Sequence, residues 1–307
     1  TLTEYGANGF HTFFGYHDII PFDAADELLL ANRCRASVEL ITAGIPLELG
    51  YYNTSLTNPK FESFATTTSW CWQQGCRLQW YPNASKSNSM VFFNTSANGR
   101  HTSCIFDIRS GQKVKSFDRA IYALSHDGSF GISLNFSRLQ RLRPGYGYGD
   151  VVDATINELS PDSDGLWMLD LNTGKDKLIL SLSEISKYHA EPSMNGATHY
   201  FNHILWSPNG KNFFFLHLWV TPEGKRHSRA CIWNIKNKSF SLLGTDSIVS
   251  HHCWIDNKTL ILFTKELGLG MRYHTYDIEK GCTGSVGVNL LCEDGHPSMS
   301  SINSALM

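Results

Sequence analysis

Long apolar runs are missing from this chain of 307 residues. A membrane-spanning helix needs about 18 or more consecutive apolar residues, so we expect no membrane span. Charge of one sign is also scarce, because 26 Lys and Arg residues stand against 28 Asp and Glu residues and the formal net charge is -2. Phosphate binding needs a basic surface, so this balance argues against nucleic acid as a partner.

Paired cysteines and linkers are scarce as well. Of the eight cysteines, Cys71 and Cys76 are close enough to suggest a small disulfide loop, but no second pair completes a zinc site. The mostly isolated cysteines and the lack of a secretory leader pattern favour a cytoplasmic location over a periplasmic or secreted one. No linker rich in Pro, Gly or Ser divides the chain, which predicts a single domain over residues 1–307.

A strand, a tight turn and a second strand between residues 202 and 217 form the unit that organises the sequence. Residues 204–206 and 213–216 are apolar, and Ser207-Pro208-Asn209-Gly210 lies between them. Pro208 fixes its own φ and Gly210 tolerates a positive φ, so the segment predicts a β-hairpin. Weaker copies of it occur at residues 78–83, 122–128 and 252–257.

A second phrase, an apolar strand that ends in Asp or Asn and a turn, follows each copy of the hairpin. It occurs at residues 105–111, 168–174, 232–238 and 275–281. Two hairpins per unit make four-stranded modules, which at a spacing of roughly 40 or more residues are typical of propeller blades. We therefore predict an all-β propeller with five blades, with six or seven as alternatives and a β-sandwich as the competing fold.

The expected blades cover most of the chain. The first lies before residue 64, and the others span residues 78–117, 121–182, 203–243 and 251–291, with an insertion at residues 135–166 inside the third. The tail at residues 293–300 resembles the opening of a further blade. It either completes the first blade or forms a short sixth blade with it, because a ring must protect its sheet edges.

Three histidines occupy the same position in successive blade openings. His203, His251 and His296 each stand three residues before the position of Trp206, and a slip of one residue would replace His251 by His252. Inner strands line the channel of a propeller, so these imidazoles could converge on a divalent metal such as manganese or zinc. The competing interpretation is coincidence, since the chain has 13 histidines.

Two further polar turns are expected at the same channel. Residues 70–75 end in a turn that places Gln74 and Trp72 near the axis, and residues 15–18 bring His17 and Asp18 to the first blade. Gln74 is a candidate ligand or sugar contact. The alternative for each segment is a capped turn with aromatic packing.

The insertion carries a cluster of arginines followed by a Gly/Tyr loop: Arg138, Arg141, Arg143, Tyr146 and Tyr148. Guanidinium groups grip carboxylates with two hydrogen bonds, and tyrosine rings stack on sugars while their hydroxyls can donate protons. This combination predicts an acidic oligo- or polysaccharide as the partner. The alternative is that the arginines pair with Asp and Glu side chains of the protein itself.

These residues carry a resemblance to a known family. The Trp-Ser-Pro-Asn-Gly turn, His252-Cys253-Trp254 and Asp294-Gly295-His296-Pro297-Ser298 resemble the TolB-type propellers, and among them oligogalacturonate lyase and its polysaccharide-associated relatives. The resemblance implies a divalent metal, usually manganese, with His203, His251 or His252, and His296 as ligands and Arg138 as the base. The chain departs from that pattern because residues 293–297 offer one histidine where the lyase groups a glutamine and two histidines.

Three functions follow from this sequence. The first is β-elimination on a uronate-containing glycan, with Arg138, Tyr146 or His17 removing the proton and with Arg141, Arg143, Tyr148, Gln74, Trp72 and Asp18 binding the substrate. The second is glycoside hydrolysis by paired carboxylates, for which Asp18 and Glu191 are candidates and Asp150 is a reserve. The third is a carbohydrate- or protein-binding propeller without catalysis.

Overall fold

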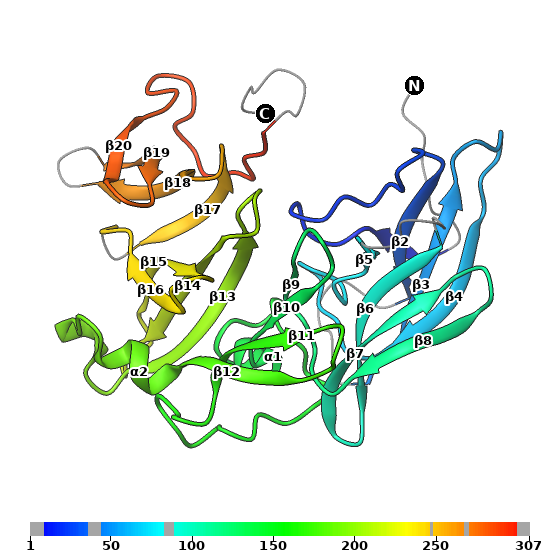
Figure 1. The fold of residues 1–307 in the computed structure, drawn as a ribbon, viewed down its shortest axis with the longest axis horizontal. Helices are drawn as coiled ribbons and strands as arrows, with labels where there is room; N and C mark the ends of the chain where they lie inside the picture. The colour runs from blue at the N-terminus through cyan, green and yellow to red at the C-terminus, as the bar shows by residue number, and fades with distance from the viewer. Residues whose placement is uncertain (1–8, 36–43, 83–88, 246–247, 267–269, 300–307) are drawn as a thin grey trace. The chain divides into compact units, whose positions relative to one another are not determined.

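The computed structural model describes residues 9–35, 44–82, 89–245, 248–266 and 270–299, and these form five four-stranded antiparallel sheets (Figure 1). Strands account for 47% of the chain, well above the usual quarter. The prediction of an all-β propeller with five four-stranded blades is confirmed.

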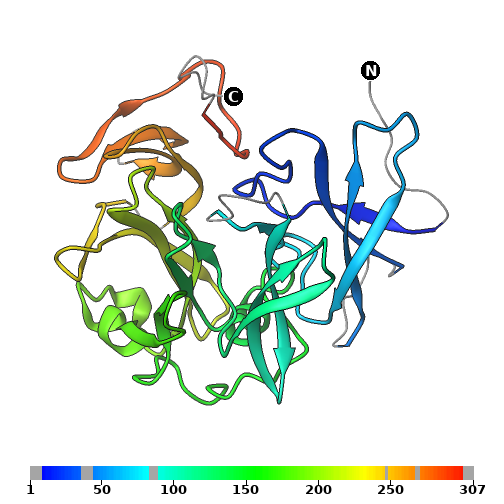
Figure 2. The ribbon, with the colours of Figure 1, turned by 45° about the vertical axis from the view of Figure 1, so that its right-hand side comes forward.

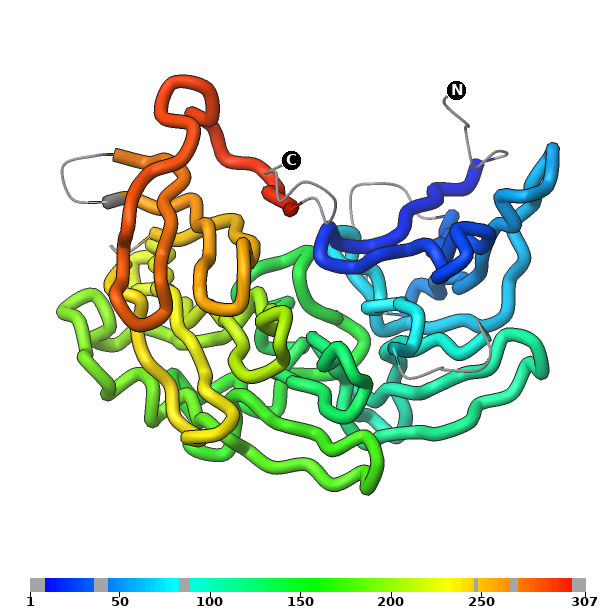
Figure 3. The backbone as a smooth tube through the Cα atoms, turned by 45° about the horizontal axis from the view of Figure 1, so that its top comes forward, coloured from blue at the N-terminus to red at the C-terminus, as the bar shows by residue number. Residues whose placement is uncertain are grey.

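In each sheet the strands are neighbours in chain order, and Figure 3 shows the course of the backbone from one hairpin to the next. The first two sheets consist of β1 (His11–Phe13), β2 (Leu28–Cys34), β3 (Leu47–Asn53), β4 (Phe61–Thr67), and of β5 (Gln79–Trp80), β6 (Met90–Ala97), β7 (Arg100–Asp107), β8 (Gln112–Phe117). The third consists of β9 (Ala123–Leu124), β10 (Phe130–Ser133), β11 (Gly165–Asp170) and β12 (Asp176–Ser181). The last two consist of β13 (Thr198–Trp206), β14 (Asn212–Val220), β15 (Arg226–Asn234), β16 (Ser239–Leu242), and of β17 (Val249–Trp254), β18 (Thr259–Glu266), β19 (Gly270–Asp277), β20 (Gly281–Ser285).

The chain divides into two compact units. Unit 1 comprises Thr1–Ile156 and Met168–Lys177, and unit 2 comprises Asn157–Trp167 and Leu178–Met307. The single domain over residues 1–307 stays a prediction. Within the described residues the helices are α1 (Phe136–Leu142), α2 (Leu182–Lys187) and a short 3-10 turn at Pro192–Met194. None of these is long and apolar enough to cross a membrane.

The first type of hairpin turn repeats in atomic detail. The Ser207 hydroxyl donates to Oδ1 of Asn209 over 2.9 Å and accepts the N–H of Asn212. In the copy between β9 and β10, the Ser125 hydroxyl donates to Oδ1 of Asp127 over 2.6 Å. Gly210 and Gly128 follow with φ of 66° and 68°. The repeated hairpin is therefore a repeated turn, as the sequence predicted.

The second type of turn is also shared by four blades. The side chains of Asp107, Asp170 and Asp277 each accept the backbone N–H of the residue two positions later, and that of Asn234 accepts the N–H of Asn237, three positions later, all over 2.8 to 3.0 Å. Four positions after each of them the backbone is left-handed, at Gly111, Gly174, Lys238 and Gly281. Lys238 is the member without glycine, with φ of 53°. This turn is the physical basis of the second repeated phrase.

Buried apolar side chains between the strands form separate cores in the two units. In unit 1 one cluster centres on Trp70, Leu49 and Phe93, and another on Phe92 and Ile121. None of the eight cysteines, all of which lie in the described part of the chain, forms a disulfide. The disulfide loop suggested for Cys71 and Cys76 is therefore not formed; both thiols lie in the interior, where burial raises the pKa of Cys71 to about 12.

Two expectations for unit 1 have definite outcomes. The insertion inside the third blade is confirmed, since β10 ends at Ser133 and β11 begins at Gly165. Residues 15–23, expected as a strand and a turn, contain turns and an isolated bridge from Phe22 to Leu29, and the first strand, β1, precedes them. Gly15, at φ of 122°, and Pro21 disfavour a continuous strand there.

Candidate functional sites

Unit 1 contains a group of polar and aromatic side chains that we name the Tyr-Arg cluster: Tyr16, His17, Asp18, Arg77, Tyr122, Arg143 and Tyr146. They come from four segments of the chain. These are the turn after β1, the residues before β5, the residue before β9 and the insertion after α1. Backbone contact joins two of the segments, because Gln73 donates its N–H to the carbonyl of Gly145 over 3.4 Å.

An ion pair forms the inner part of the cluster. Arg77 donates from Nη1 and Nη2 to the two carboxylate oxygens of Asp18 over 3.1 and 2.8 Å, and its guanidinium lies 4.7 Å from the centre of the Tyr122 ring. Burial opposes the charge of Arg77, but Asp18 outweighs it and the pKa of Arg77 is raised. Gln74 supports the ring by donating to the Tyr122 hydroxyl over 2.8 Å. Asp18 is thus committed to a structural pair.

The outer part of the cluster is half-buried and carries the groups suited to chemistry. The guanidinium of Arg143 lies 4.3 Å from the centre of the Tyr146 ring and donates to its hydroxyl over 3.4 Å. The His17 ring lies 4.4 Å from the ring of Tyr16. Burial, together with Tyr122 and Tyr146, raises the pKa of Tyr16 far above its ordinary value. Tyr16 therefore stays a neutral phenol at physiological pH.

Tight packing against α1 fixes the insertion that supplies Arg143 and Tyr146. Tyr148 stacks on Phe136 with ring centres 4.2 Å apart, and its hydroxyl accepts a hydrogen bond from Asn94 over 2.9 Å. A Cβ at Gly147 would overlap the carbonyl oxygen of Phe136 and the backbone nitrogen of Gln140. The glycine in this loop is thus required for close approach.

The end of the insertion is anchored by Asp150. Its carboxylate is 2.9 Å from Nε2 of His101 and accepts the Ser69 hydroxyl over 2.7 Å. Burial raises the pKa of Asp150, but the bonds from His101 and Ser69 outweigh burial and hold it well below its usual range. The reserve carboxylate of the hydrolase interpretation is therefore occupied in holding the loop.

The three arginines of the insertion have different places. Arg138, which is 1% exposed, donates from Nη1 to the carbonyl and the hydroxyl oxygen of Thr155, both over 3.1 Å. Arg141 donates to Asp153 from Nε and Nη2 over 3.0 and 2.9 Å. Only Arg143 of the three belongs to the Tyr-Arg cluster. Arg141 thus pairs with an acidic side chain of the protein itself, which is the alternative given above for these arginines.

The remaining predicted contacts of unit 1 are buried or half-buried. Gln74 is 1% exposed and Tyr148 is fully buried. Trp72 is half-buried, and its ring centre lies 5.0 Å from that of Trp70 and 5.4 Å from that of Phe13. These side chains position the cluster, and we do not assign them direct contact with a substrate.

Unit 2 contains the four histidines predicted as metal ligands, and they form two pairs. The rings of His203 and His252 are 5.7 Å apart and both side chains are buried. The rings of His251 and His296 are 4.2 Å apart. Among the described residues no group of three or more His, Cys, Asp or Glu side chains is placed to hold a metal ion. The side chains as placed do not fit a metal centre with three ligands. The bound metal therefore stays a prediction.

An acid-base pair accompanies the second pair of histidines. Nδ1 of His251 is 2.8 Å from a carboxylate oxygen of Asp294, and the Ser250 hydroxyl donates to the other oxygen. Burial raises the pKa of Asp294, but the bonds from His251 and Ser250 outweigh it and lower the pKa. Asp294 thereby orients the His251 ring.

Sequence reasoning missed Arg77, Tyr16 and Tyr122. Arg77 follows the predicted turn at Gln74 by three residues, but nothing in the sequence pairs it with Asp18, which is 59 positions away. The positive φ of Arg77, 59°, could not be predicted either, because arginine is uncommon in that conformation.

Comparison with known proteins assigns the chain to no family. No protein-family model matches the chain, and no curated protein matches it. Similar solved structures include TolB from Acinetobacter baumannii, with a TM-score of 0.41, 16% identity, and coverage of 83% of this chain and 51% of that one. The propeller domain of the trilobed protease from Pyrococcus furiosus has a TM-score of 0.44 and 10% identity, over 89% and 72% of the two chains. Oligogalacturonate lyase from Vibrio parahaemolyticus has a TM-score of 0.37 and 11% identity, over 90% and 84%.

This chain thus spans about half the length of TolB. Identities of 10 to 16% and TM-scores below 0.5 carry no conclusion about activity. The five four-stranded sheets define the class, an all-β propeller. What the chain does has to be argued from its sites.

Proposed function

We propose that the chain binds an acidic glycan at the Tyr-Arg cluster and cleaves it by β-elimination. The observation that carries the proposal is the half-buried Arg143 held over Tyr146 in the same cluster as His17. A planar guanidinium suits the carboxylate of a uronate, and an aromatic ring suits the face of a sugar. Arg77 is less suited to this role because Asp18 already balances its charge.

The reaction needs a cation, a base and an acid. Arg143 would bind the uronate carboxylate and stabilise the negative charge that develops when the proton on the adjacent C5 is removed. The His17 imidazole would accept that proton, the bond between C4 and the leaving oxygen would break, and a C4=C5 double bond would form. The Tyr146 hydroxyl would protonate the leaving oxygen, and exchange with solvent would restore His17 and Tyr146.

The structure favours this assignment over the predicted base Arg138. A base must reach the proton that it removes. Arg138 lies in the interior, and its Nη1 donates two hydrogen bonds to Thr155. The paired-carboxylate alternative is less favoured as well, because Asp18 accepts both hydrogen bonds from Arg77. A binding role without catalysis uses the same Arg143 and Tyr146 and remains the second candidate.

Polygalacturonate and alginate, each assayed with and without manganese, test the proposal. We expect an increase in ultraviolet absorbance from the unsaturated uronide, and Arg143→Ala should lower the rate by about 100-fold. Arg143→Lys should restore little, because an ammonium group cannot reproduce the two parallel hydrogen bonds. Arg141→Ala is the matched control, since it removes the same charge from the same insertion outside the cluster.

Each alternative has its own outcome. Binding of either polymer that depends on Arg143, without an unsaturated product, would establish the binding role and reject the reaction. Elimination that survives Arg143→Ala would reject the cluster as the site. If neither polymer binds nor reacts, the acidic-glycan proposal fails.

A further inference from the structure

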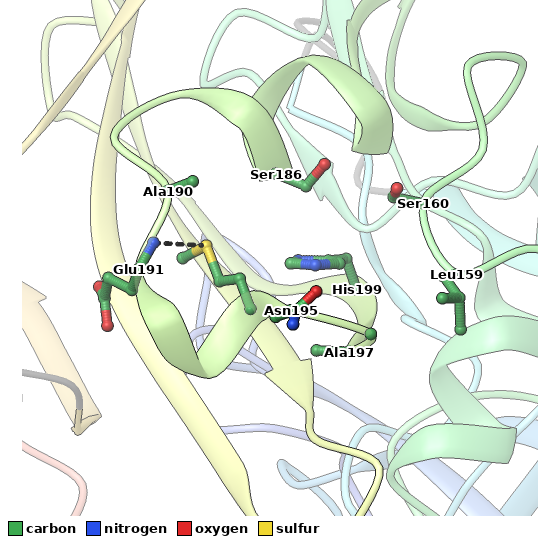
Figure 4. A pocket seen from close by; sticks show the side chains of 10 residues that line it. Leu159, Ser160, Ser186, Ala190, Glu191, Asn195, Ala197 and His199 are labelled. Atoms are coloured by element: carbon green, nitrogen blue, oxygen red, sulfur yellow. Dashed lines mark hydrogen bonds between the residues drawn. The ribbon is translucent and has the colours of Figure 1, made fainter.

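Unit 2 has a pocket with a volume of about 340 Å³ that the function proposed above does not use. It lies where α2, the 3-10 turn and the start of β13 meet; Figure 2 shows α2 in light green. Apolar groups from Leu159, Met194 and Ala197 form part of its wall. The polar part comes from Ser160, Ser186, Glu191, Asn195 and His199. Figure 4 shows the His199 ring extending from β13 between Ser186 and Asn195.

A buried chain of three side chains stands behind the His199 ring. Arg229 donates from Nε to Nδ1 of His217 over 3.0 Å, and Nε2 of His217 is 2.9 Å from Nδ1 of His199. The three residues are 2 to 3% exposed or fully buried, and they lie on the neighbouring strands β15, β14 and β13. Arg229 is fixed in turn by the carbonyl oxygens at the end of α2, those of Ile185 and Tyr188.

The direction of these hydrogen bonds is dictated by the arginine. A guanidinium Nε always carries hydrogen, so Nδ1 of His217 must accept. The proton of neutral His217 is then on Nε2, and Nδ1 of His199 must accept it. Neutral His199 consequently carries its own proton on Nε2. Two histidines are thus each restricted to one tautomer by a single arginine.

The same arrangement disfavours the protonated form of His199. A proton on Nδ1 of His199 would point at the N–H of His217, which cannot change tautomer while Arg229 donates to its other nitrogen. Burial, assisted by His199 and Arg229, lowers the pKa of His217 well below its ordinary value. In its neutral form His199 is therefore a hydrogen-bond donor at Nε2.

Charge at the pocket limits the kind of ligand. Glu191 lines the pocket, and its negative charge opposes an anion. The positively charged guanidinium of Arg229 lies within electrostatic range of Glu191. It therefore opposes the binding of a cationic ligand. Mixed donors and acceptors beside an apolar wall suit a neutral molecule with several hydroxyl groups. The volume is at the lower end of the range of roughly 300 to 1,000 Å³ for ligand sites, which favours a small molecule.

We propose that this pocket binds a neutral monosaccharide, with His199 donating to one of its oxygens and with Ser160, Ser186 and Asn195 contacting its hydroxyls. The proposal is independent of the acidic-glycan function of unit 1, because no residue is shared between the two sites. It predicts millimolar affinity, typical of a small polar ligand.

Titration of the full chain with glucose, galactose and mannose, followed by methyl NMR of Met194 and Ala197, tests the proposal. We expect saturable shifts of these methyls with at least one of the three sugars, and weaker binding of glucuronate. His199→Asn is the informative variant, because the asparagine oxygen can replace Nδ1 as acceptor for His217 while the donor at Nε2 is lost. It should weaken sugar binding by roughly tenfold and leave the fold intact.

His227→Asn is the matched control. It makes the same substitution on β15, where His227 stacks on Trp219 with ring centres 5.4 Å apart, outside the pocket. It should leave sugar affinity unchanged. Nitrogen-15 spectra of the wild-type imidazoles should show the Nε2–H tautomer at His199 regardless of ligand. No methyl shift with any of the three sugars, tighter binding of glucuronate, or equal effects of the two variants would overturn the proposal.

Discussion

Replacing Arg138 by alanine separates a structural role from a catalytic one. The side chain lies in the interior and donates two hydrogen bonds to Thr155, on the segment that follows the Gly/Tyr loop. Each bond from a charged donor contributes about 1.5 to 3 kcal/mol, and relief of the buried charge offsets part of that loss. We therefore expect Arg138→Ala to lower the free energy of unfolding of unit 1 by about 3 kcal/mol.

Chemical denaturation monitored in unit 1 measures this effect, with two further variants for comparison. Arg138→Met keeps most of the volume and removes the charge, so it should cost less than Arg138→Ala. Arg141→Ala removes the ion pair to Asp153. The Arg141 side chain is 28% exposed, so this variant should lower the free energy of unfolding by about 1 kcal/mol or less. A change within about 0.5 kcal/mol for Arg138→Ala, combined with loss of activity on an acidic glycan, would refute the structural role.

Two further predictions concern turns and loop anchors. Lys238→Gly should stabilise the chain by about 0.5 to 1 kcal/mol in urea denaturation, because the left-handed φ of 53° costs lysine more than glycine, and an unchanged midpoint would contradict this. Asp150→Asn should cost about 2 kcal/mol at pH 7, because the carboxylate binds His101 and Ser69. The folded pKa of Asp150 is depressed, so its contribution is fully present above the unfolded value of about 4 and is lost as the pH falls through the folded pKa. The difference in stability between wild type and variant should therefore narrow below about pH 4, and a difference that stays constant down to pH 3 would contradict the assignment.

The blade architecture could be predicted because its signals are local. In the turns at Ser207 and Ser125 the hydroxyl bonds to a side chain two residues later, and a glycine with positive φ follows. Such interactions join residues that are close in the sequence, so the repeat can be recognised without a structure. The sheets then follow from the apolar strands on either side of each turn.

The sites could be predicted only in part because their contacts are long-range. Asp18, Arg143 and Tyr146 were recognised by residue type, and the structure places them in one cluster. Their partner Arg77 was not recognised, because the pairing with Asp18 depends on how two turns of unit 1 meet. Arg138 was overvalued for a similar reason. Its position in a run of arginines suggested exposure, whereas α1 turns that side chain toward the interior.

The histidines show how one residue of register changes a site. Aligning the blade openings on Trp206 and Trp254 makes His203 equivalent to His251. In β13, however, regular pairing is interrupted after Asn202 and resumes at Leu205, whereas in β17 it is interrupted after Val249 and resumes at His252. Relative to the tryptophan, pairing thus resumes one residue earlier in β17.

A shift of one residue in a strand moves a side chain to the opposite face. The bulges therefore remove the equivalence that the sequence alignment implied, and the His203 ring meets His252, while His251 meets Asp294 and His296. The two resulting groups have different chemistry: the first is a buried imidazole pair, and the second is a partly exposed histidine oriented by a carboxylate. A mechanism that treats the blade openings as equivalent would miss this difference, because in this chain the turns repeat and the bulges do not.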